Sequence, residues 1–184
     1  VILIPHGINK KFINFPRKQL NISSYSNKNN YKILYVSTIS LYKHQWNVVE
    51  AIAKLRNKYG WPLELNIVGS AGDSLAIKKL KNSITLWDPE RKWVKFNGPV
   101  SHGFLNKVYK KANLGIFASS CENMPNTLLE GMASGIPIVS SNRGPMKEVL
   151  EEVGIYFDTE IIDSIEESII KIINNKEIRE QMIK

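Results

Sequence analysis

The feature that most constrains the fold is an alternation of short apolar runs with longer segments of helical periodicity. The runs that predict strands are 31–38, 63–69, 93–98, 114–119, 136–141 and 154–157. The segments that predict helices are 45–60, about 74–86, 103–112, those opening near Pro125 and Pro145, and the C-terminus. Strands that are apolar throughout indicate parallel pairing with both faces covered. The sequence therefore predicts an α/β fold, a Rossmann-like αβα sandwich with a parallel sheet.

The first 30 residues differ in texture from the rest of the chain. The opening "VILIPHG" is an apolar run without an initiator methionine, and it predicts a strand cut from a longer protein. Residues 10–30 are polar and basic with little periodicity, which is typical of a linker. We expect a hinge strand and linker over 1–30 and one ligand-binding domain over 31–184.

Composition excludes several classes of protein. The chain has 184 residues, 43% of them apolar, with no uninterrupted apolar run near the about 18 residues of a membrane span. We therefore expect a soluble, cytoplasmic protein. The lone Cys121 cannot form a disulfide framework, which favours a reducing compartment, and we interpret it as a packing residue.

The net charge suggests a partner without identifying one. Lys and Arg outnumber Asp and Glu by 25 to 17, which gives a formal charge of +8. Such a surface can bind nucleic acid, an anionic membrane or a phosphorylated ligand, or be merely solvated. The basic residues are scattered and no nucleic-acid-binding signature accompanies them, so we expect no nucleic acid.

Several familiar motifs are missing from the sequence. It has no G-x-G-x-x-G, no G-x-x-x-x-G-K-[ST] and no G-x-S-x-G, so neither a dinucleotide fingerprint, a P-loop nor a nucleophile elbow is present. The three histidines are far apart, and the acid pairs that bracket a single residue, "DPE" at 88–90 and "DTE" at 158–160, are D-x-E at best and lie in loop-like contexts. We expect no metal site.

Two glutamates remain as the strongest candidates for function. In a parallel sheet, ligands bind outside the carboxyl ends of the strands, and both Glu122 and Glu130 follow a strand on that edge. Glu122 precedes Pro125 and is expected in a loop, whereas Glu130 lies inside the helix. A separation of about 8 to 12 Å follows from the helical rise, so they should not face each other as a catalytic carboxylate pair.

That separation suits a ligand laid across the start of the helix. The first backbone N–H groups, on Asn126, Thr127 and Leu128, are expected to lack intrahelical partners and to offer a seat for phosphate. A carboxylate on either side can accept hydrogen bonds from a diol. One would hold a sugar and the other a ribose.

The same stretch carries a family resemblance. "ENMPNTLLE", residues 122–130, resembles the E-x₇-E motif of retaining glycosyltransferases of family four, which have the GT-B fold. "GMASGIPIVSSNRGPMKEV" continues like that family's donor-binding domain. Further similar segments, in the family's order, are "IPHGINKKF", "ILYVSTISLYKHQWNVVEAIAKL", "LNIVGSAG", "VKFNGPVSHGFLNKVYKKANLGIFAS" and "GIYFD". The resemblance covers nearly the whole chain and implies the C-terminal half of a GT-B fold.

The resemblance also implies roles for individual residues. Glu122 and Lys43 would be the catalytic residues, with Lys43 on the donor's diphosphate, where a fixed ammonium stabilises the leaving charge. The remaining implied contacts are Glu122, Asn123 and Met124 with the donor sugar, Asn126, Thr127 and Leu128 with phosphate, Glu130 with ribose, and Lys95 and Phe96 with the base.

The sequence departs from the family in a few positions. Thr38 stands where relatives often have an arginine, and Arg143 or Lys147 could substitute for that cation. Pro125 replaces a glycine whose N–H could donate to the sugar. His6 occupies a slot that is often asparagine. Gly69 and Gly72 permit a close backbone approach or a plain turn, and His44 and His102 receive no role.

The resemblance implies a domain that binds a nucleoside diphosphate sugar, most often UDP- or GDP-linked, for transfer to a glycan or glycolipid in polysaccharide biosynthesis. No cofactor is expected. The acceptor would be held by an N-terminal domain missing from this chain, so we expect the fragment to be inactive alone. Peripheral contact with an anionic membrane is an option. The alternatives are a sugar-nucleotide epimerase of the same fold and a non-catalytic nucleotide-sugar-binding module.

Overall fold

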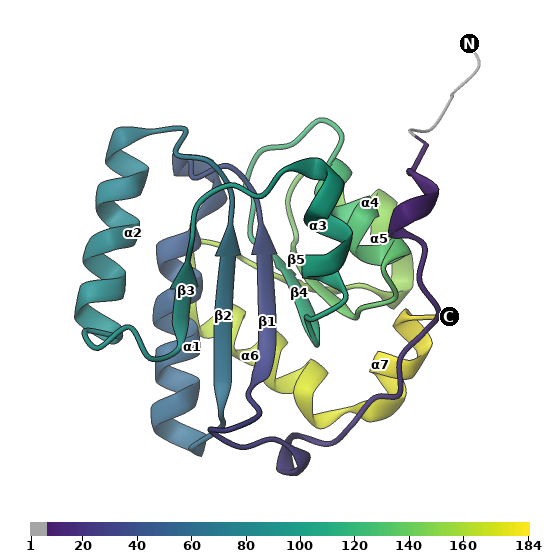
Figure 1. Ribbon diagram of the computed structural model, residues 1–184, viewed down its shortest axis with the longest axis horizontal. Helices are drawn as coiled ribbons and strands as arrows, with labels where there is room; N and C mark the ends of the chain where they lie inside the picture. Colours follow the sequence, from purple (N-terminus) through teal and green to yellow (C-terminus); the bar gives the residue numbers. More distant parts are fainter. Residues whose placement is uncertain (1–6) are drawn as a thin grey trace.

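The computed structural model describes residues 7–184, and its centre is a parallel six-stranded sheet (Figure 1). The strands are β1 (Tyr31–Val36), β2 (Leu63–Val68), β3 (Val94–Phe96), β4 (Leu114–Phe117), β5 (Ile138–Ser141) and β6 (Ile155–Phe157). They lie in the order β3-β2-β1-β4-β5-β6, and every neighbouring pair is parallel. The predicted parallel α/β fold is confirmed. The strand predicted at the start of the chain, with His6, lies outside the described residues.

Helices cover both faces of the sheet. They are α1 (Gln45–Tyr59), α2 (Ser74–Trp87), α3 (His102–Tyr109), α4 (Asn126–Ala133), α5 (Met146–Leu150), α6 (Ile162–Asn174) and α7 (Lys176–Met182). The buried side chains of α1, α2 and α6 form one apolar cluster with the sheet, and those of α3, α4 and α5 form a second. The sheet is therefore the middle layer of an αβα sandwich (Figure 1).

The central strand β1 shows why these runs are apolar throughout. Ile33 and Tyr35 belong to the cluster under α1, α2 and α6, whereas Leu34 between them belongs to the cluster under α3, α4 and α5. Successive side chains of a strand point to opposite faces. Because both faces are buried here, the run Ile33–Val36 is apolar without alternation, and the polar exception in β1 is Lys32 near its start.

The strand order brings together two loops that are distant in sequence. From β1 the chain builds outward to β2 and β3, then returns to the other side of β1 and builds β4, β5 and β6. The loops that follow β1 and β4 therefore lead to opposite sides of the sheet from its carboxyl edge, which is where parallel α/β sheets bind ligands. The first loop carries the short helix η3 (Leu41–Lys43), and the second carries Glu122.

The segment before β1 is packed against the domain. It contains the short helices η1 (Lys10–Phe12) and η2 (Ile22–Ser24), and Phe12 is fully buried in the cluster of α3, α4 and α5. The Arg17 guanidinium donates to the backbone oxygens of Lys110 and Ala112. Arg179 of α7 donates to the Leu20 oxygen at 2.9 Å. This polar segment is therefore a strap along the domain surface (Figure 1).

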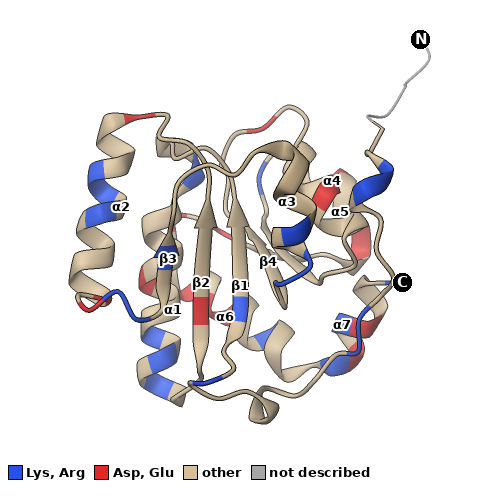
Figure 2. Ribbon diagram, in the orientation of Figure 1, with Lys and Arg blue, Asp and Glu red and all other residues tan. Residues whose placement is uncertain are grey.

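Basic residues are spread over several elements. Figure 2 shows Lys and Arg on α1, α2, α3 and α7, with Asp and Glu on several of the same elements.

Within residues 7–184, no helix combines the length and the apolar character needed to cross a membrane.

The loops after β1 and β2 touch each other, and Gly69 makes this possible. The Ile39 N–H donates to the Ser70 oxygen at 2.9 Å, and the Ile39 oxygen accepts from the Gly72 N–H at 3.1 Å. A Cβ atom added to Gly69 would lie 1.7 Å from the Ser37 oxygen. The close backbone approach expected of this glycine is therefore present, and it shapes the loop that carries Thr38 and η3.

We predict that Gly69→Ala destabilises the fold, because the new methyl group overlaps the Ser37 backbone, which can move away only if the loop is distorted. The expected loss in the free energy of unfolding is about 1 to 3 kcal/mol, as for overpacked sites. Urea denaturation measures it. Gly103→Ala is the matched control, since a Cβ there meets nothing within 4 Å. Equal stability of Gly69→Ala and wild type would show that the two loops do not approach this closely.

Candidate functional site

Lys43 lies at the carboxyl edge of β1, with its ammonium enclosed by aromatic rings and a carboxylate. The residue is only 8% exposed, and its Nζ atom lies 5.1 Å from the Tyr42 ring centroid and 5.2 Å from that of Phe117. The Tyr35 hydroxyl donates to the Lys43 backbone oxygen at 2.5 Å and so fixes the turn. The cation is held in position before any ligand arrives.

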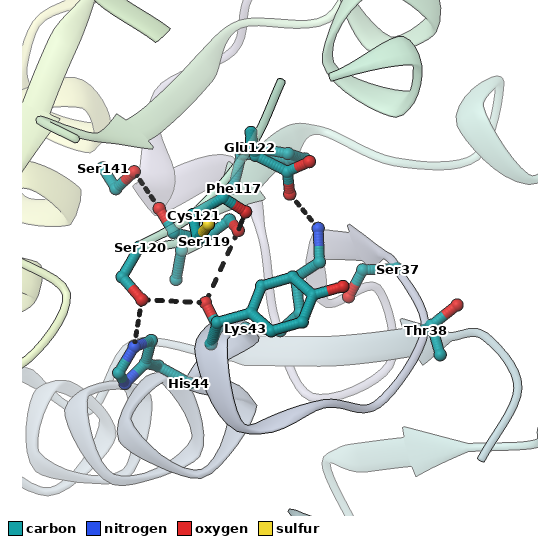
Figure 3. Close-up of polar contacts among 12 residues, drawn as sticks. Ser37, Thr38, Lys43, His44, Phe117, Ser119, Ser120, Cys121, Glu122 and Ser141 are labelled. Atoms are coloured by element: carbon teal, nitrogen blue, oxygen red, sulfur yellow. Dashed lines mark hydrogen bonds and ion pairs between the residues drawn. The ribbon is translucent and has the colours of Figure 1, made fainter. Parts of the chain in front are cut away.

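Glu122 contacts Lys43 directly from the loop after β4. Its Oε1 atom accepts from the Lys43 Nζ in a close ion pair, and both side chains are mostly buried (Figure 3). The two residues are 79 positions apart in sequence and come from the loops after β1 and β4. The structure thus brings the two predicted catalytic residues together at the switch point of the sheet.

Hydrogen bonds fasten these two loops to each other. The Ser120 N–H donates to the Tyr42 oxygen at 2.8 Å, and the Ser120 hydroxyl lies 3.0 Å from His44 Nε2. A further bond fastens the loop after β4 to the neighbouring strand: Ser141, at the end of β5, donates its hydroxyl to the Ser119 oxygen at 2.5 Å (Figure 3). Burial lowers the pKa of His44, which favours the neutral ring at this contact. His44 therefore has a structural part in holding the Lys43 turn.

Glu130 belongs to a second group, beneath the start of α3. Its Oε1 atom lies 2.7 Å from His102 Nε2, and His102 Nδ1 lies 3.2 Å from the Lys11 Nζ. The Glu130 side chain is 9% exposed and that of His102 is 60% exposed, so the imidazole stands between the carboxylate and solvent. Burial first, and then the Glu130 charge, raise the pKa of the neighbouring Tyr109.

The start of α4 differs from the expectation of three free N–H groups. Pro125 is the residue that precedes the helix, and its oxygen accepts from the Leu128 N–H at 2.9 Å. The Asn126 N–H donates to the Met124 oxygen at 3.0 Å. The prediction that these two groups lack partners is wrong, because the tight turn at Pro125 folds carbonyls back onto them. Within the described residues, the Thr127 N–H has no acceptor.

The predicted base-binding residues lie apart from Glu130. The Lys95 ammonium donates to the Arg91 oxygen, which lies before β3 at its amino end, and Phe96 packs in the cluster under α1, α2 and α6. Glu130 and His102 are on the elements α4 and α3, which cover the opposite face. Phe96 is therefore on the other face of the sheet from Glu130, and the Lys95 ammonium is engaged at the amino end of β3.

The candidate substitutes for the family arginine are also engaged elsewhere. Arg143 donates to Asp158 at 3.0 Å, and the Lys147 ammonium lies 5.9 Å from the Tyr156 ring. Thr38 is exposed and lies apart from the Lys43–Glu122 pair (Figure 3). Lys43 is therefore the cation that the structure places against Glu122.

Residues flanking Glu122 are open to solvent. Asn123 is exposed and Met124 is 40% exposed, so both can meet a ligand over this loop.

Cys121 is exposed as well, and its interpretation as a packing residue is wrong. Its backbone oxygen accepts from the Ser119 hydroxyl, so the turn directs the cysteine side chain outward. Among residues 7–184 no group of three or more His, Cys, Asp or Glu side chains could hold a metal ion.

Two residues of the site, Lys11 and His102, have no role that the sequence alone predicts. Lys11 is 91 positions from His102, which is itself 28 positions from Glu130, so no local pattern connects them. One signal was available for His102. It follows the strand β3 and opens a helix, which places it on the same carboxyl edge as Glu130.

Comparison with known families gives this geometry a context. Residues 17–184 match the sequence profile of the family described as "Glycosyl transferases group 1". The chain therefore belongs to the group 1 glycosyl transferases.

Two curated relatives have low sequence identity to this chain. An O-antigen chain mannosyltransferase B of Escherichia coli is 28% identical over 88 residues, 48% of this chain and 23% of the relative. A 2-deoxystreptamine N-acetyl-D-glucosaminyltransferase of Niallia circulans is 24% identical over 153 residues, 82% of this chain and 38% of the relative. The chain thus spans well under half the length of these enzymes.

Solved structures confirm the fold. HepE of Anabaena, crystallised with UDP and glucose, superposes with a TM-score of 0.76 at 20% identity, over 90% of this chain and 48% of HepE. The C-terminal domain of a group 1 glycosyl transferase of Francisella tularensis has a TM-score of 0.76 at 18% identity, over 97% of this chain and 93% of that domain. The predicted GT-B half is confirmed as the fold of this chain.

We predict that Lys43 and Glu122 depend on each other for stability. Lys43→Met and Glu122→Gln should each lower the free energy of unfolding by about 1 to 3 kcal/mol, because each leaves a mostly buried charge without its counter-charge. The double variant should lose less than the sum of the two. Urea denaturation of all four proteins gives the coupling.

The exposed pair Lys176–Glu180, at 3.4 Å on α7, is the control for this cycle. Its coupling should be about 0.5 kcal/mol or less. A coupling between Lys43 and Glu122 no larger than that of the exposed pair would contradict the ion pair as placed.

Proposed function

We propose that this chain is the donor-binding domain of a retaining glycosyltransferase of family four, which transfers a sugar from a nucleoside diphosphate sugar to a glycan or glycolipid. The observation that carries the proposal is the contact of Lys43 with Glu122 across the switch point of the sheet. It places a cation suited to phosphate beside a carboxylate suited to sugar hydroxyls. Membership of the group 1 family supports it.

In the proposed mechanism the two residues exchange partners when the donor binds. The Lys43 ammonium turns from Glu122 to the diphosphate, and the freed carboxylate accepts hydrogen bonds from the donor sugar, beside the exposed Asn123 and Met124. Breaking the glycosidic bond leaves growing negative charge on the diphosphate. A fixed ammonium stabilises that charge more in the transition state than in the bound donor, so it lowers the barrier.

The nucleotide would extend from Lys43 along the start of α4. There the Thr127 N–H can donate to phosphate together with the positive end of the helix dipole, while Asn126 and Leu128 contribute only if their present hydrogen bonds open. Glu130, one turn further along α4, would accept from the ribose hydroxyls. The order sugar, diphosphate, ribose then follows the line from Glu122 to Glu130.

The substrate class is inferred from the relatives. HepE was crystallised with UDP and glucose, and two curated relatives are named for transfer of mannose and N-acetylglucosamine. We propose a UDP- or GDP-sugar as donor, and polysaccharide or glycolipid synthesis in the cytoplasm as the setting. Peripheral contact with an anionic membrane is consistent with the charge of +8.

We predict that Glu130→Ala weakens binding of UDP and GDP more than Glu122→Ala does. The ribose contact is present in the bare nucleotide, whereas the sugar contact needs the donor. Loss of hydrogen bonds to a charged group costs about 1.5 to 3 kcal/mol. Glu122→Ala also frees Lys43 for phosphate, so its affinity for bare UDP should be equal or higher. Calorimetric titration measures the affinities of both variants. Glu148→Ala is the control, because Glu148 is an exposed residue of α5. A larger loss in Glu122→Ala would reverse the roles of the two acids.

These titrations are run in EDTA, because the proposed site holds phosphate with Lys43 and a backbone N–H and needs no metal. Affinity should be the same after Mg²⁺ or Mn²⁺ is restored. Binding that appears only with the metal would refute a metal-free site.

We further predict that this 184-residue chain binds the nucleotide but transfers no sugar. Transfer requires an acceptor held within about 3 to 3.5 Å of the reacting carbon in a site that excludes water. The chain covers 48% of HepE, and we propose that the acceptor site lies in the part it does not match. Turnover is assayed with a panel of UDP- and GDP-sugars, beside a longer form of the protein. Comparable turnover by both would place the acceptor site within these residues.

A further inference from the structure

The contact of His102 with Glu130 and Lys11 has no part in the mechanism above. Lys11 comes from η1 in the strap before β1, His102 from the start of α3, and Glu130 from α4. Three separate elements thus converge on one imidazole ring. The ring also lies 5.2 Å from the fully buried Phe12 ring, which fixes its plane.

The chemistry of the two partners fixes the proton on the ring. A lysine ammonium has only donors, so His102 Nδ1, 3.2 Å from Lys11 Nζ, must accept and carries no proton. The proton of the neutral ring is then on Nε2, which donates to Glu130 Oε1 at 2.7 Å. Lys11 therefore selects the tautomer that holds the carboxylate.

The second oxygen of Glu130 is without a partner. Within the described residues, Oε2 is buried and makes no hydrogen bond. A buried, unsatisfied carboxylate oxygen is costly and calls for an explanation. Each oxygen of a carboxylate accepts hydrogen bonds by itself, so Oε2 can accept from a ligand while Oε1 stays on His102.

We infer that His102 is a positioning residue for the nucleotide's ribose: its Nε2–H, set by Lys11, holds one oxygen of Glu130 and leaves the other for the 2′- and 3′-hydroxyls. This inference rests on the proposed function, because it assigns a ligand to the same carboxylate. It adds that the strap before β1 is a working part of the nucleotide site.

The first test compares UDP with 2′,3′-dideoxy-UDP by calorimetry on the whole chain. His102→Ala should weaken UDP about tenfold or more, since it releases a hydrogen bond to a charged group. The affinity for the dideoxy nucleotide should stay as in wild type, because that ligand has no hydroxyl for Glu130. His102→Gln, which keeps an N–H donor, should recover part of the loss. Lys107→Ala, exposed on the same helix, is the control.

Three outcomes of this titration would overturn the inference. Equal losses for both nucleotides would mean a merely structural role, and no loss would mean no role. Tighter binding of UDP by His102→Ala would mean that the ring blocks the ribose. If the wild-type protein binds neither UDP nor GDP, the proposed function fails and the inference fails with it, whereas the three outcomes above leave the proposed function standing.

The second test reads the tautomer directly and needs no nucleotide. The ¹⁵N NMR shifts of the His102 ring, assigned by difference from His102→Ala, should show a proton on Nε2 and none on Nδ1. Lys11→Met should mix the two tautomers and weaken UDP but not dideoxy-UDP, while Lys10→Met, exposed in the same short helix, should change neither. A wild-type ring with its proton on Nδ1 would overturn the proposal that Lys11 sets the tautomer with which His102 holds Glu130.

Discussion

The structure depends on one constraint, the burial of a parallel sheet on both faces. Because α1, α2 and α6 cover one face and α3, α4 and α5 the other, the sheet faces are filled by apolar side chains. Polar groups collect instead at the carboxyl edge, where the connections after the neighbouring parallel strands β1 and β4 lead to opposite sides of the sheet. Lys43 and Glu122 meet there although 79 positions separate them. The site is a consequence of strand order.

The fold could be predicted well because its signals are local. Apolar runs mark the strands, and the helix expected over 74–86 is found at Ser74–Trp87, after an Asp73 side chain that accepts from the Ala76 N–H. The partners of the site residues could not be predicted, because each comes from a distant loop. The exposure of Cys121 and the occupied Leu128 N–H depend on turn geometry that the residue types alone do not specify.

The charged groups of the site are already paired within the chain. Lys43 is on Glu122, and the Glu130 carboxylate is on the His102 ring, which in turn meets Lys11. A ligand that binds here exchanges these contacts for its own, so only the difference appears as affinity. The internal pairs lower the cost of holding charges in mostly buried positions while the site is empty. They also keep each side chain near the place where the proposed ligand needs it.

The strap before β1 is packed against the domain that follows it. Its composition is typical of a linker, yet Phe12 is fully buried against α3 and α4, the Arg17 side chain donates to the backbone after α3, and Arg179 donates to the Leu20 oxygen. A polar, aperiodic sequence can be ordered when a few side chains anchor it, and composition does not reveal such anchors. Since Lys11 directly precedes the buried Phe12 and reaches His102, a shift of the strap would change the contacts of Glu130. The segment that composition separates from the domain is therefore mechanically joined to the proposed ribose contact.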